Sequence, residues 1–269
     1  MGDILSRNGL QAARESAEQL NDVIAQVTDA QWDLPSACAG WRVIDIIAHL
    51  AALAHEAVTP PPPDPSAPTV RERYHDYRVN QRRAYTHAQV IEEWQTYGPR
   101  QLDLLEEAQD GERSEETVAV PGLGTYPRHM LANTMAFNVF CHLRNDMLAP
   151  DGPLPIRVPA PTDGLVAPAV KFMLAGLPQM QGTELTATVT EPLVLRLTGP
   201  GAMTVTVHPA DAPNELLTVS SGRDGFIEIT STATDFIRWA TQRKNWRDYC
   251  QITGDRSAAQ PFLDRLNII

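Results

Sequence analysis

The chain has 269 residues, which is long enough for two ordinary domains that each bury a hydrophobic core. Its 22 Lys and Arg against 33 Asp and Glu give a formal net charge of −11, which argues against nucleic acid and anionic membranes as partners because both need clustered cations. Cys38, Cys141 and Cys250 form neither a disulfide framework nor a CxxC zinc pattern, and are typical of reduced thiols. We therefore expect a cytoplasmic monomer that binds small molecules.

Residues 1–150 have the pattern of a helical bundle. Apolar side chains at three- and four-residue steps predict helices over residues 3–27, 42–57, 70–85, 87–109 and 127–148. Thr86 is suited to cap the fourth of these helices, and Pro99 predicts a kink or a break inside it. Residues 59–68, TPPPPDPSAP, predict a stiff polyproline-like loop, and residues 110–126 predict a further loop. Long helices joined by loops favour an all-α four-helix bundle.

Residues 151–164 are rich in Pro and Gly and predict a linker, after which the sequence pattern changes. A short helix is expected at 165–177, followed by short alternating runs typical of strands at 184–190, 192–198, 203–208 and 215–220. Helices are predicted again at 232–242 and 256–266, with Asp255 capping the last one. Strands followed by helices indicate a smaller α+β domain over 165–269 with an antiparallel sheet, so the fold class predicted for the whole chain is α+β.

Four polar residues on two of the predicted bundle helices form a candidate metal site. His49 lies in an apolar helix, whereas Asn138, His142 and Asp146 follow one another at steps of four residues and drift by only about 40° per step. Asn138 and His142 can therefore face His49 in a bundle. Two imidazoles and a carboxylate at helical spacing can hold a catalytic metal with one position open. A single histidine on an apolar face is more often a hydrogen-bonded core residue, so the spacing alone leaves both interpretations open.

Several segments resemble one known family. Residues 35–50, PSACAGWRVIDIIAHL, resemble the signature of the mycothiol-dependent maleylpyruvate isomerase family, part of the wider DinB-like metal-binding helical bundles. Residues 136–154, AFNVFCHLRNDMLAPDGPL, are similar to the second metal segment of that family. The motifs GPGAMTVTV, DFIRWATQRKN and TGDRSAAQPFLDRL resemble the sterol-carrier-protein-like domain often fused behind the bundle. The resemblance extends over nearly the whole chain.

The resemblance implies metal ligands at His49, Asn138 and His142. The two histidines match the family, but Asn138 stands where the family has Glu or Asp. Loss of a charged ligand weakens zinc binding, because an amide offers only a neutral carbonyl oxygen. Asp146, one turn further on, could replace the lost ligand or orient His142. Three outcomes stay open at this point, namely an altered site, a looser site completed by water, and a lost site.

The same resemblance implies the chemistry. A divalent metal, Zn²⁺, would bind the sulfur of a small thiol cofactor, mycothiol, and present it as thiolate to a small electrophilic substrate for isomerisation or transfer. An arginine from the C-terminal domain, Arg243 or Arg238, would hold a carboxylate of that substrate. Each arginine can equally be an ordinary surface residue of an amphipathic helix. The alternative function is a non-catalytic protein that binds a small ligand and has a degenerate metal site.

Three further features carry weaker expectations. The Arg- and Tyr-rich run at 71–83 could line the mouth of a pocket and attract an anionic cofactor, but such a run is more often a solvated helix. His75, within this run, has no partner pattern. Cys38 lies where a helix N-terminus could stabilise a thiolate, although a small buried apolar side chain is the commoner role.

Overall fold

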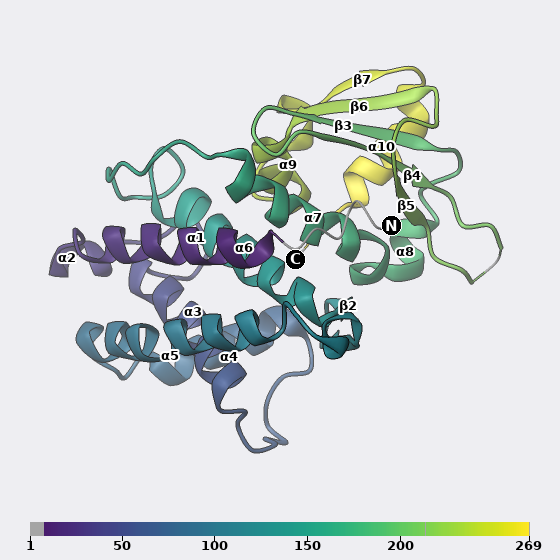
Figure 1. Cartoon of the computed structure of the whole chain (residues 1–269). Helices are drawn as coiled ribbons and strands as arrows, with labels where there is room; N and C mark the ends of the chain where they lie inside the picture. Colours follow the sequence, from purple (N-terminus) through teal and green to yellow (C-terminus); the bar gives the residue numbers. More distant parts are fainter. Residues whose placement is uncertain (1–7, 213, 269) are drawn as a thin grey trace.

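The computed structural model describes residues 8–212 and 214–268, and it shows a helical bundle packed against a mixed sheet with its own helices. Residues 3–7 of the first predicted helix lie outside the described residues. The α+β class predicted from the sequence is confirmed. Figure 1 shows the bundle on one side of the molecule and the sheet on the other, with α7 between them.

Four helices make the bundle, and a fifth packs on its side. The four are α1 (Gly9–Ile24), α3 (Val43–Val58), α5 (His87–Glu107) and α6 (Leu131–Cys141), and the fifth is α4 (Arg71–Arg82). Helix α3 packs against α5 and α4, and α1 packs against α6. Small residues let these helices approach closely: a Cβ added at Gly9 would lie 2.1 Å from Oδ1 of Asn133. The bundle pattern read from apolar periodicity therefore corresponds to real packing.

Local structure in the bundle differs from the sequence prediction at three places. Residues 28–41, which connect the first two predicted helices and are called the connector below, contain a one-turn helix, α2 (Asp29–Trp32). Residues 110–126, predicted as loop, contain the short helix η1 (Glu112–Glu115) and the hairpin β1 (Thr117–Val120) with β2 (Gly124–Pro127). The hairpin turn uses Gly122 at φ 76°, a conformation that glycine adopts without strain.

Helix α5 passes through Pro99 without a break. Thr86 caps it as predicted by accepting a hydrogen bond from the backbone amide of Gln89. Pro99 is exposed, while Trp94 and Leu105 on the same helix are buried. Packing of the buried side against α3 outweighs the one backbone hydrogen bond that proline removes.

The C-terminal half is built on a five-stranded sheet with the order β5-β4-β3-β6-β7. The strands are β3 (Leu193–Thr198), β4 (Met203–His208), β5 (Thr218–Ser221), β6 (Ile227–Thr232) and β7 (Gln251–Thr253), and the helices are α7 (Asp163–Met180), α8 (Gly182–Thr186), α9 (Ala233–Ala240) and α10 (Arg256–Arg265), with the short η4 (Trp246–Asp248). Asp255 caps α10 as predicted, by accepting from the amide of Ser257.

Two predictions for this half are wrong. The sheet is mixed and not purely antiparallel, because β3 and β6 pair in parallel at its centre. The connection between them passes through β4 and β5, so β6 enters the sheet in the same direction as β3. Residues 184–190 form no strand: α8 and a turn occupy this stretch, with the Thr186 hydroxyl bonded to the carbonyl of Gly182. This local side-chain bond favours a helical turn over an extended strand.

Helix α7 joins the two halves through apolar contacts. Its Phe172 is 1% exposed and packs against Tyr126 of the hairpin, at 5.5 Å between ring centroids, and against Phe137 of α6, at 5.3 Å. The hydrophobic core under the sheet therefore extends into the bundle. Whether the boundary between two domains falls at 151–164, as the sequence predicts, stays a prediction.

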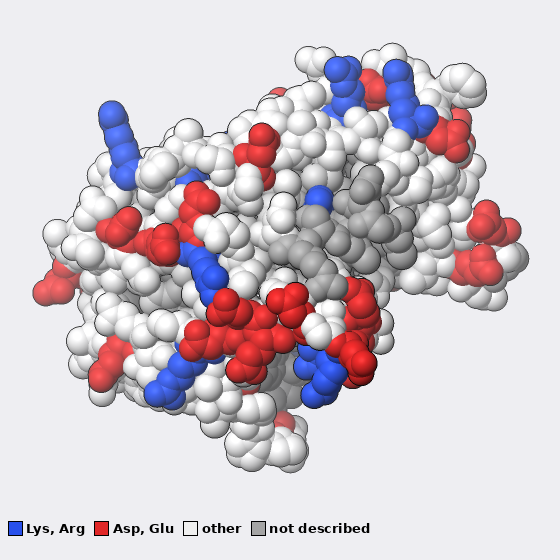
Figure 2. Space-filling model, in the orientation of Figure 1, with Lys and Arg blue, Asp and Glu red and all other residues white. Residues whose placement is uncertain are grey.

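The exposed surface agrees in sign with the net charge. Figure 2 shows a band of acidic side chains across the middle of one face, with basic side chains at its borders. No helix among the described residues has both the length and the apolar character needed to cross a membrane.

Replacing Phe172 by alanine tests the junction. We expect the free energy of unfolding to fall by about 3–5 kcal/mol, because the variant leaves a cavity between α7, α6 and the hairpin. Urea unfolding followed by circular dichroism measures this. Phe226→Ala is the matched control, since Phe226 is 97% exposed and its loss should be nearly neutral. Equal effects of the two substitutions would contradict this account of the junction.

Candidate functional site

A cavity of about 800 Å³ opens between the bundle helices and the C-terminal half. Its wall is formed by residues of α3, α4, α5 and α6, by the β1–β2 hairpin, and by Arg243 of the segment after α9. Much of the lining is apolar, including Leu50, Leu53 and Met135. The polar side chains of the lining include His49, His75, Asn138, His142 and Arg243.

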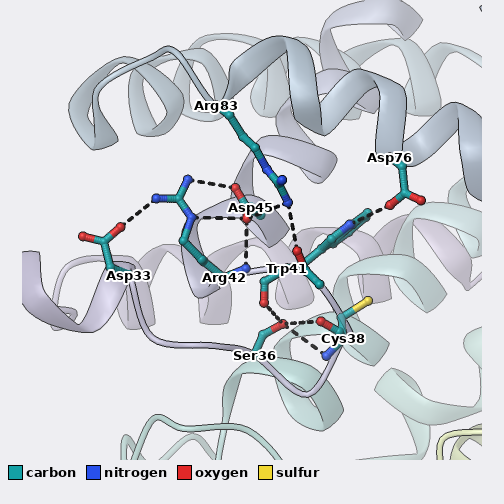
Figure 3. Close-up of polar contacts among 9 residues, drawn as sticks. Asp33, Ser36, Cys38, Trp41, Arg42, Asp45, Asp76 and Arg83 are labelled. Atoms are coloured by element: carbon teal, nitrogen blue, oxygen red, sulfur yellow. Dashed lines mark hydrogen bonds and ion pairs between the residues drawn. The ribbon is translucent and has the colours of Figure 1, made fainter.

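The connector before α3 orients the first histidine. Trp41, 8% exposed, lies with its ring 5.1 Å from that of His49 and stacks on His142 at 6.1 Å. Its indole Nε1 donates to Asp76 of α4 at 2.8 Å, as Figure 3 shows. The Trp41 ring therefore fills the space beside both imidazoles, and its hydrogen bond keeps α4 close to them.

A second set of contacts holds α4 to the connector. Arg83 donates to the carbonyl of Gly40 at 2.8 Å and lies 3.5 Å from Asp45, in the first turn of α3 (Figure 3). Asp45 also accepts from the backbone and side chain of Arg42, which reaches Asp33. The connector and α4 are thus joined by charged groups on the far side of Trp41 from the cavity.

His142 contacts the carboxylate of Asp146, and an arginine from the C-terminal half of the chain in turn holds that carboxylate. Its Nδ1 is 2.7 Å from Oδ2 of Asp146, which is 1% exposed. Arg243 donates Nε to Oδ1 of Asp146 at 2.9 Å and Nη2 to Oδ2 at 2.7 Å. This bidentate pair crosses from the C-terminal half to the bundle. Asp146 therefore orients His142, which is the second of the two roles that the sequence left open.

The segment that carries this pair is not a regular α-helix. Residues His142–Met147 form a π-helical turn, η3, that continues α6. A π-helical turn is wider than an α-helical one and is rare outside functional sites. The spacing of four residues predicted a shared face for His142 and Asp146, and the structure places them in contact, although in a different helical geometry.

The predicted metal ligands meet at the cavity wall. Nε2 of His49 is 3.5 Å from the side-chain nitrogen of Asn138, and the rings of His49 and His142 are 4.9 Å apart. Nδ1 of His49 is buried and has no hydrogen-bond partner. The oxygen and nitrogen of an asparagine amide can exchange places by a flip, so Asn138 can present its carbonyl oxygen to the same space.

A third imidazole, for which the sequence showed no partner pattern, lies beside these two. His75 of α4 lies with its ring 4.6 Å from that of His49, edge to face. Its position could have been noticed from its spacing of four residues after Arg71, because both line the cavity from one face of α4. The packing of α4 across α3 is a tertiary feature, and the sequence alone does not show it.

Burial keeps two of these imidazoles neutral. It lowers the pKa of His49 well below its ordinary value, and the neighbouring His142 and His75 lower it further. Burial, with the positive charge of Arg71 and the proximity of His142, lowers the pKa of His75 to about 3. Neutral imidazoles have a free nitrogen lone pair at physiological pH, which is the form that binds metals.

The donor set fits a divalent metal with one weak ligand. Nε2 of His49, which faces Asn138, and the carboxylate-oriented ring of His142 are suited to zinc. Within residues 8–212 and 214–268, however, no group of three or more His, Cys, Asp and Glu side chains could hold a metal ion. The third protein ligand would therefore have to be the neutral amide of Asn138.

The other candidates are placed as follows. Arg238 does not line the cavity; it contacts Asn145 at 3.2 Å and forms an ion pair with Asp151 at 2.8 Å. Arg243 does line the cavity and is the better candidate of the two. Burial, together with the nearby charge of Asp146, raises the pKa of Cys38 to about 11, so its thiol stays protonated at neutral pH. The thiolate interpretation of Cys38 is therefore wrong.

The fold and the site define a class of protein: a helical bundle with a histidine-lined cavity that is closed by an arginine from a fused α+β half. Residues 13–144 match the family model described as the mycothiol maleylpyruvate isomerase N-terminal domain. The match confirms the family resemblance read from the sequence for this part of the chain, whereas the sterol-carrier-protein-like domain stays a prediction.

Two solved structures share the fold over nearly the full length. A crystal structure of the mycothiol-dependent maleylpyruvate isomerase is 19% identical, with a TM-score of 0.55, and covers 92% of this chain and 93% of that chain. A histidine-to-alanine variant of that isomerase is 18% identical, with a TM-score of 0.57 and the same coverage. At this identity the likeness concerns the fold alone. Among curated proteins, none matches the chain significantly in sequence.

Replacing Arg243 by glutamine tests the contact between the two halves. Burial raises the pKa of Asp146, but the hydrogen bonds from Arg243 and His142 outweigh it and hold the pKa at about 2. Without Arg243, burial should dominate and the pKa should rise. Because the native pKa lies below the ordinary value of about 3.9, the stabilisation by Asp146 is present above pH 4 and is lost as the pH falls through 2.

Carbon-13 NMR of the Asp146 carboxyl group measures this titration. With burial dominant, the folded-state pKa of Asp146 in the variant should lie above its unfolded value, so the carboxylate should destabilise the variant at neutral pH and this loss should diminish as the solution is acidified, opposite to the native protein. Arg238→Gln is the matched control, since it removes the same charge from the same half of the chain without touching Asp146. An unchanged Asp146 titration in Arg243→Gln would contradict the bidentate pair.

Proposed function

We propose that this protein catalyses a thiol-dependent isomerisation or transfer on a small electrophilic substrate that bears a carboxylate. The observation that carries the proposal is the pair of buried imidazoles, His49 and His142, on the wall of a large cavity, with Asp146 and Arg243 behind one of them. Membership of residues 13–144 in the isomerase domain family supports the same reaction class. The expected cofactor is mycothiol, bound in the cavity together with the substrate.

His49 and His142 would hold a divalent metal, expected to be Zn²⁺, with the carbonyl oxygen of Asn138 as a third, weaker ligand. When bound, the metal lowers the pKa of a coordinated thiol, so that the cofactor supplies a thiolate nucleophile at neutral pH. Asp146 accepts the Nδ1 proton of His142 and so fixes the tautomer that leaves Nε2 free as a ligand. The protein contributes this orientation before any ligand enters.

The cavity wall would provide the remaining functions. Trp41 and the apolar lining exclude water from the imidazoles, which strengthens electrostatic interactions with a bound anion. Arg243 reaches the cavity but uses Nε and Nη2 to hold Asp146. Its guanidinium therefore cannot also grip a carboxylate with the same fork. We assign Arg243 the role of holding Asp146 and His142 in place and of adding positive charge near the substrate.

A second function, binding of a small ligand without catalysis, is supported by one observation. Asn138 is neutral where the family has an acidic ligand, and none of the described His, Cys, Asp and Glu side chains form a group of three that could hold a metal. In that case the cavity would keep its shape and bind an apolar or anionic molecule. The metal content of the native protein separates the two functions.

Metal content is measured by mass spectrometry on protein purified without a metal-binding tag. We expect about one divalent ion per native chain, at least about tenfold tighter binding in Asn138→Asp because a carboxylate replaces an amide, and loss of the ion in His49→Ala. Thr134→Ala, in the same cavity wall, is the control and should keep the metal. A native protein without metal, together with an Asn138→Asp variant that binds it, would favour the non-catalytic function.

Replacing Asp146 by asparagine tests its role behind His142. We expect kcat/KM for mycothiol-dependent isomerisation of maleylpyruvate to fall about 10–100-fold, the usual effect of losing a carboxylate that orients a ligating histidine. Asp151→Asn is the control, because Asp151 pairs with Arg238 and Lys244 outside the cavity. Thermal unfolding of both variants checks that they fold. Native activity in a folded Asp146→Asn variant would remove Asp146 from the mechanism.

A further inference from the structure

Arg71, the first residue of α4, is a cavity-lining arginine that has no carboxylate partner. Its Nη1 donates to the backbone carbonyl of Pro121 in the hairpin turn. No carboxylate within residues 8–212 and 214–268 forms an ion pair with it, whereas Arg78 and Arg82 of the same helix pair with Glu56 and Glu93. Arg71 therefore differs from its neighbours in having only a neutral acceptor.

Arg71 is partly closed to water and has two tyrosines among its neighbours. Burial lowers the pKa of its guanidinium, and the groups that counter this effect are Tyr126, Tyr74 and Glu56. Glu56 is already occupied by Arg78 and by the hydroxyl of Tyr74. A positive charge removed from water without an anionic partner is unfavourable, and a bound anion would offset that cost.

Arg71 is also close enough to the imidazole cluster to affect it. Its charge contributes to the lowered pKa of His75 and, more weakly, to that of His49. A group bound to Arg71 would therefore lie within electrostatic range of His49 and His75, on the wall that we assign to the chemistry.

The other arginines of the cavity wall are already paired. Arg113 and Arg128 share the carboxylate of Glu116, at 3.1 and 3.2 Å, and Arg243 holds Asp146. Within the described part of the chain, Arg71 is thus the cavity-lining arginine with no carboxylate of its own. Its Nε and Nη2 groups carry the remaining donors, which suit the two oxygens of a carboxylate.

We propose that Arg71 is the anion-binding residue of the cavity and that it receives a carboxylate of the substrate. The assignment of that carboxylate to a substrate rests on the proposed function, but binding of the anion does not. Glu72 and Glu107 also line the cavity and are exposed. Their negative charge disfavours phosphate dianions, so the subsite is suited to a single carboxylate group of the bound molecule.

Benzoate is a suitable probe, because it carries one carboxylate and is inert towards thiols, and benzamide is its neutral counterpart of the same shape. Calorimetric titration at constant ionic strength should show that the native protein binds benzoate more tightly than benzamide. Arg71→Gln should weaken benzoate binding at least about tenfold, and Arg71→Lys should weaken it less, because lysine keeps the charge but loses the fork. Benzamide binding should be unchanged in both variants.

Arg113→Gln is the matched control, since it removes the same charge from the same cavity wall where Glu116 already neutralises it. It should change benzoate affinity less than twofold. Benzamide affinity also reports on the shape of the cavity. If Arg71→Gln loses affinity for both ligands, the hairpin contact to Pro121 has been lost with the charge. In that case the comparison of the two ligands in Arg71→Lys decides the test. Retained affinity for benzamide with a selective loss of benzoate in Arg71→Lys would support the proposal.

Three results would overturn the proposal: equal affinity of the native protein for benzoate and benzamide, native benzoate affinity in Arg71→Gln, or a loss in Arg113→Gln as large as in Arg71→Gln. The titrations add no thiol, and the Arg71 and Arg113 variants keep His49, Asn138 and His142, so the comparison between them is independent of the reaction. A protein that binds benzoate through Arg71 but does not isomerise maleylpyruvate would contradict the proposed function and leave the subsite intact. Isomerisation of maleylpyruvate with an unchanged KM in Arg71→Gln would contradict the assignment of Arg71 to the substrate carboxylate and leave the proposed function intact.

Discussion

The bidentate ion pair between Arg243 and Asp146 is the contact on which the rest of the site depends. Asp146 belongs to the π-helical end of the bundle, and Arg243 follows α9 in the other half. A carboxylate that is 1% exposed needs a partner, because burial of a single charge is very unfavourable. The pair therefore links the position of the C-terminal half to the orientation of His142. An active-site histidine is in this way made sensitive to the packing of a separate part of the chain.

The apolar packing around α7 makes that link rigid. Phe172 lies between the hairpin and α6, so the helix that precedes the sheet is anchored to the helix that carries Asn138. Trp41 anchors another helix beside the imidazoles, because its hydrogen bond to Asp76 holds α4. The polar site is thus enclosed by aromatic side chains from three separate segments. Such a shell lowers the local dielectric constant, and both the neutral state of His49 and His75 and the strength of the ion pair follow from it.

The sequence was sufficient to predict what depends on periodicity. The long bundle helices, the caps at Thr86 and Asp255, and the juxtaposition of His49, Asn138 and His142 follow from apolar spacing and from the family resemblance. Features decided by tertiary packing were not predictable in this way. The parallel pairing of β3 with β6 depends on the path of the chain, and the helical turn at 184–190 is stabilised by a side-chain bond within an otherwise strand-like pattern.

The same distinction applies within the site. Asp146 could be found because it is four residues from His142, but its partner Arg243 is 97 residues away, and only the family resemblance suggested that an arginine from that segment would reach the cavity. His75 and Arg71 are on a helix whose strongly polar composition is typical of a solvated surface. Their role became visible only when the contacts of Trp41 and Arg83 were known, because these contacts turn α4 towards the cavity.

The neutral Asn138 changes the charge balance of the cavity in a direction that fits the unpaired Arg71. A carboxylate at this position would add a negative charge beside His49 and would favour a metal cation. With an amide in its place, Asp146 is neutralised by Arg243, and Arg71 keeps its positive charge without a partner. The interior is therefore less suited to cations and more suited to an anionic ligand than the family pattern would be. The proposed metal site and the proposed carboxylate subsite would respond to the same charge balance, so an acidic residue at position 138 should favour the first and oppose the second.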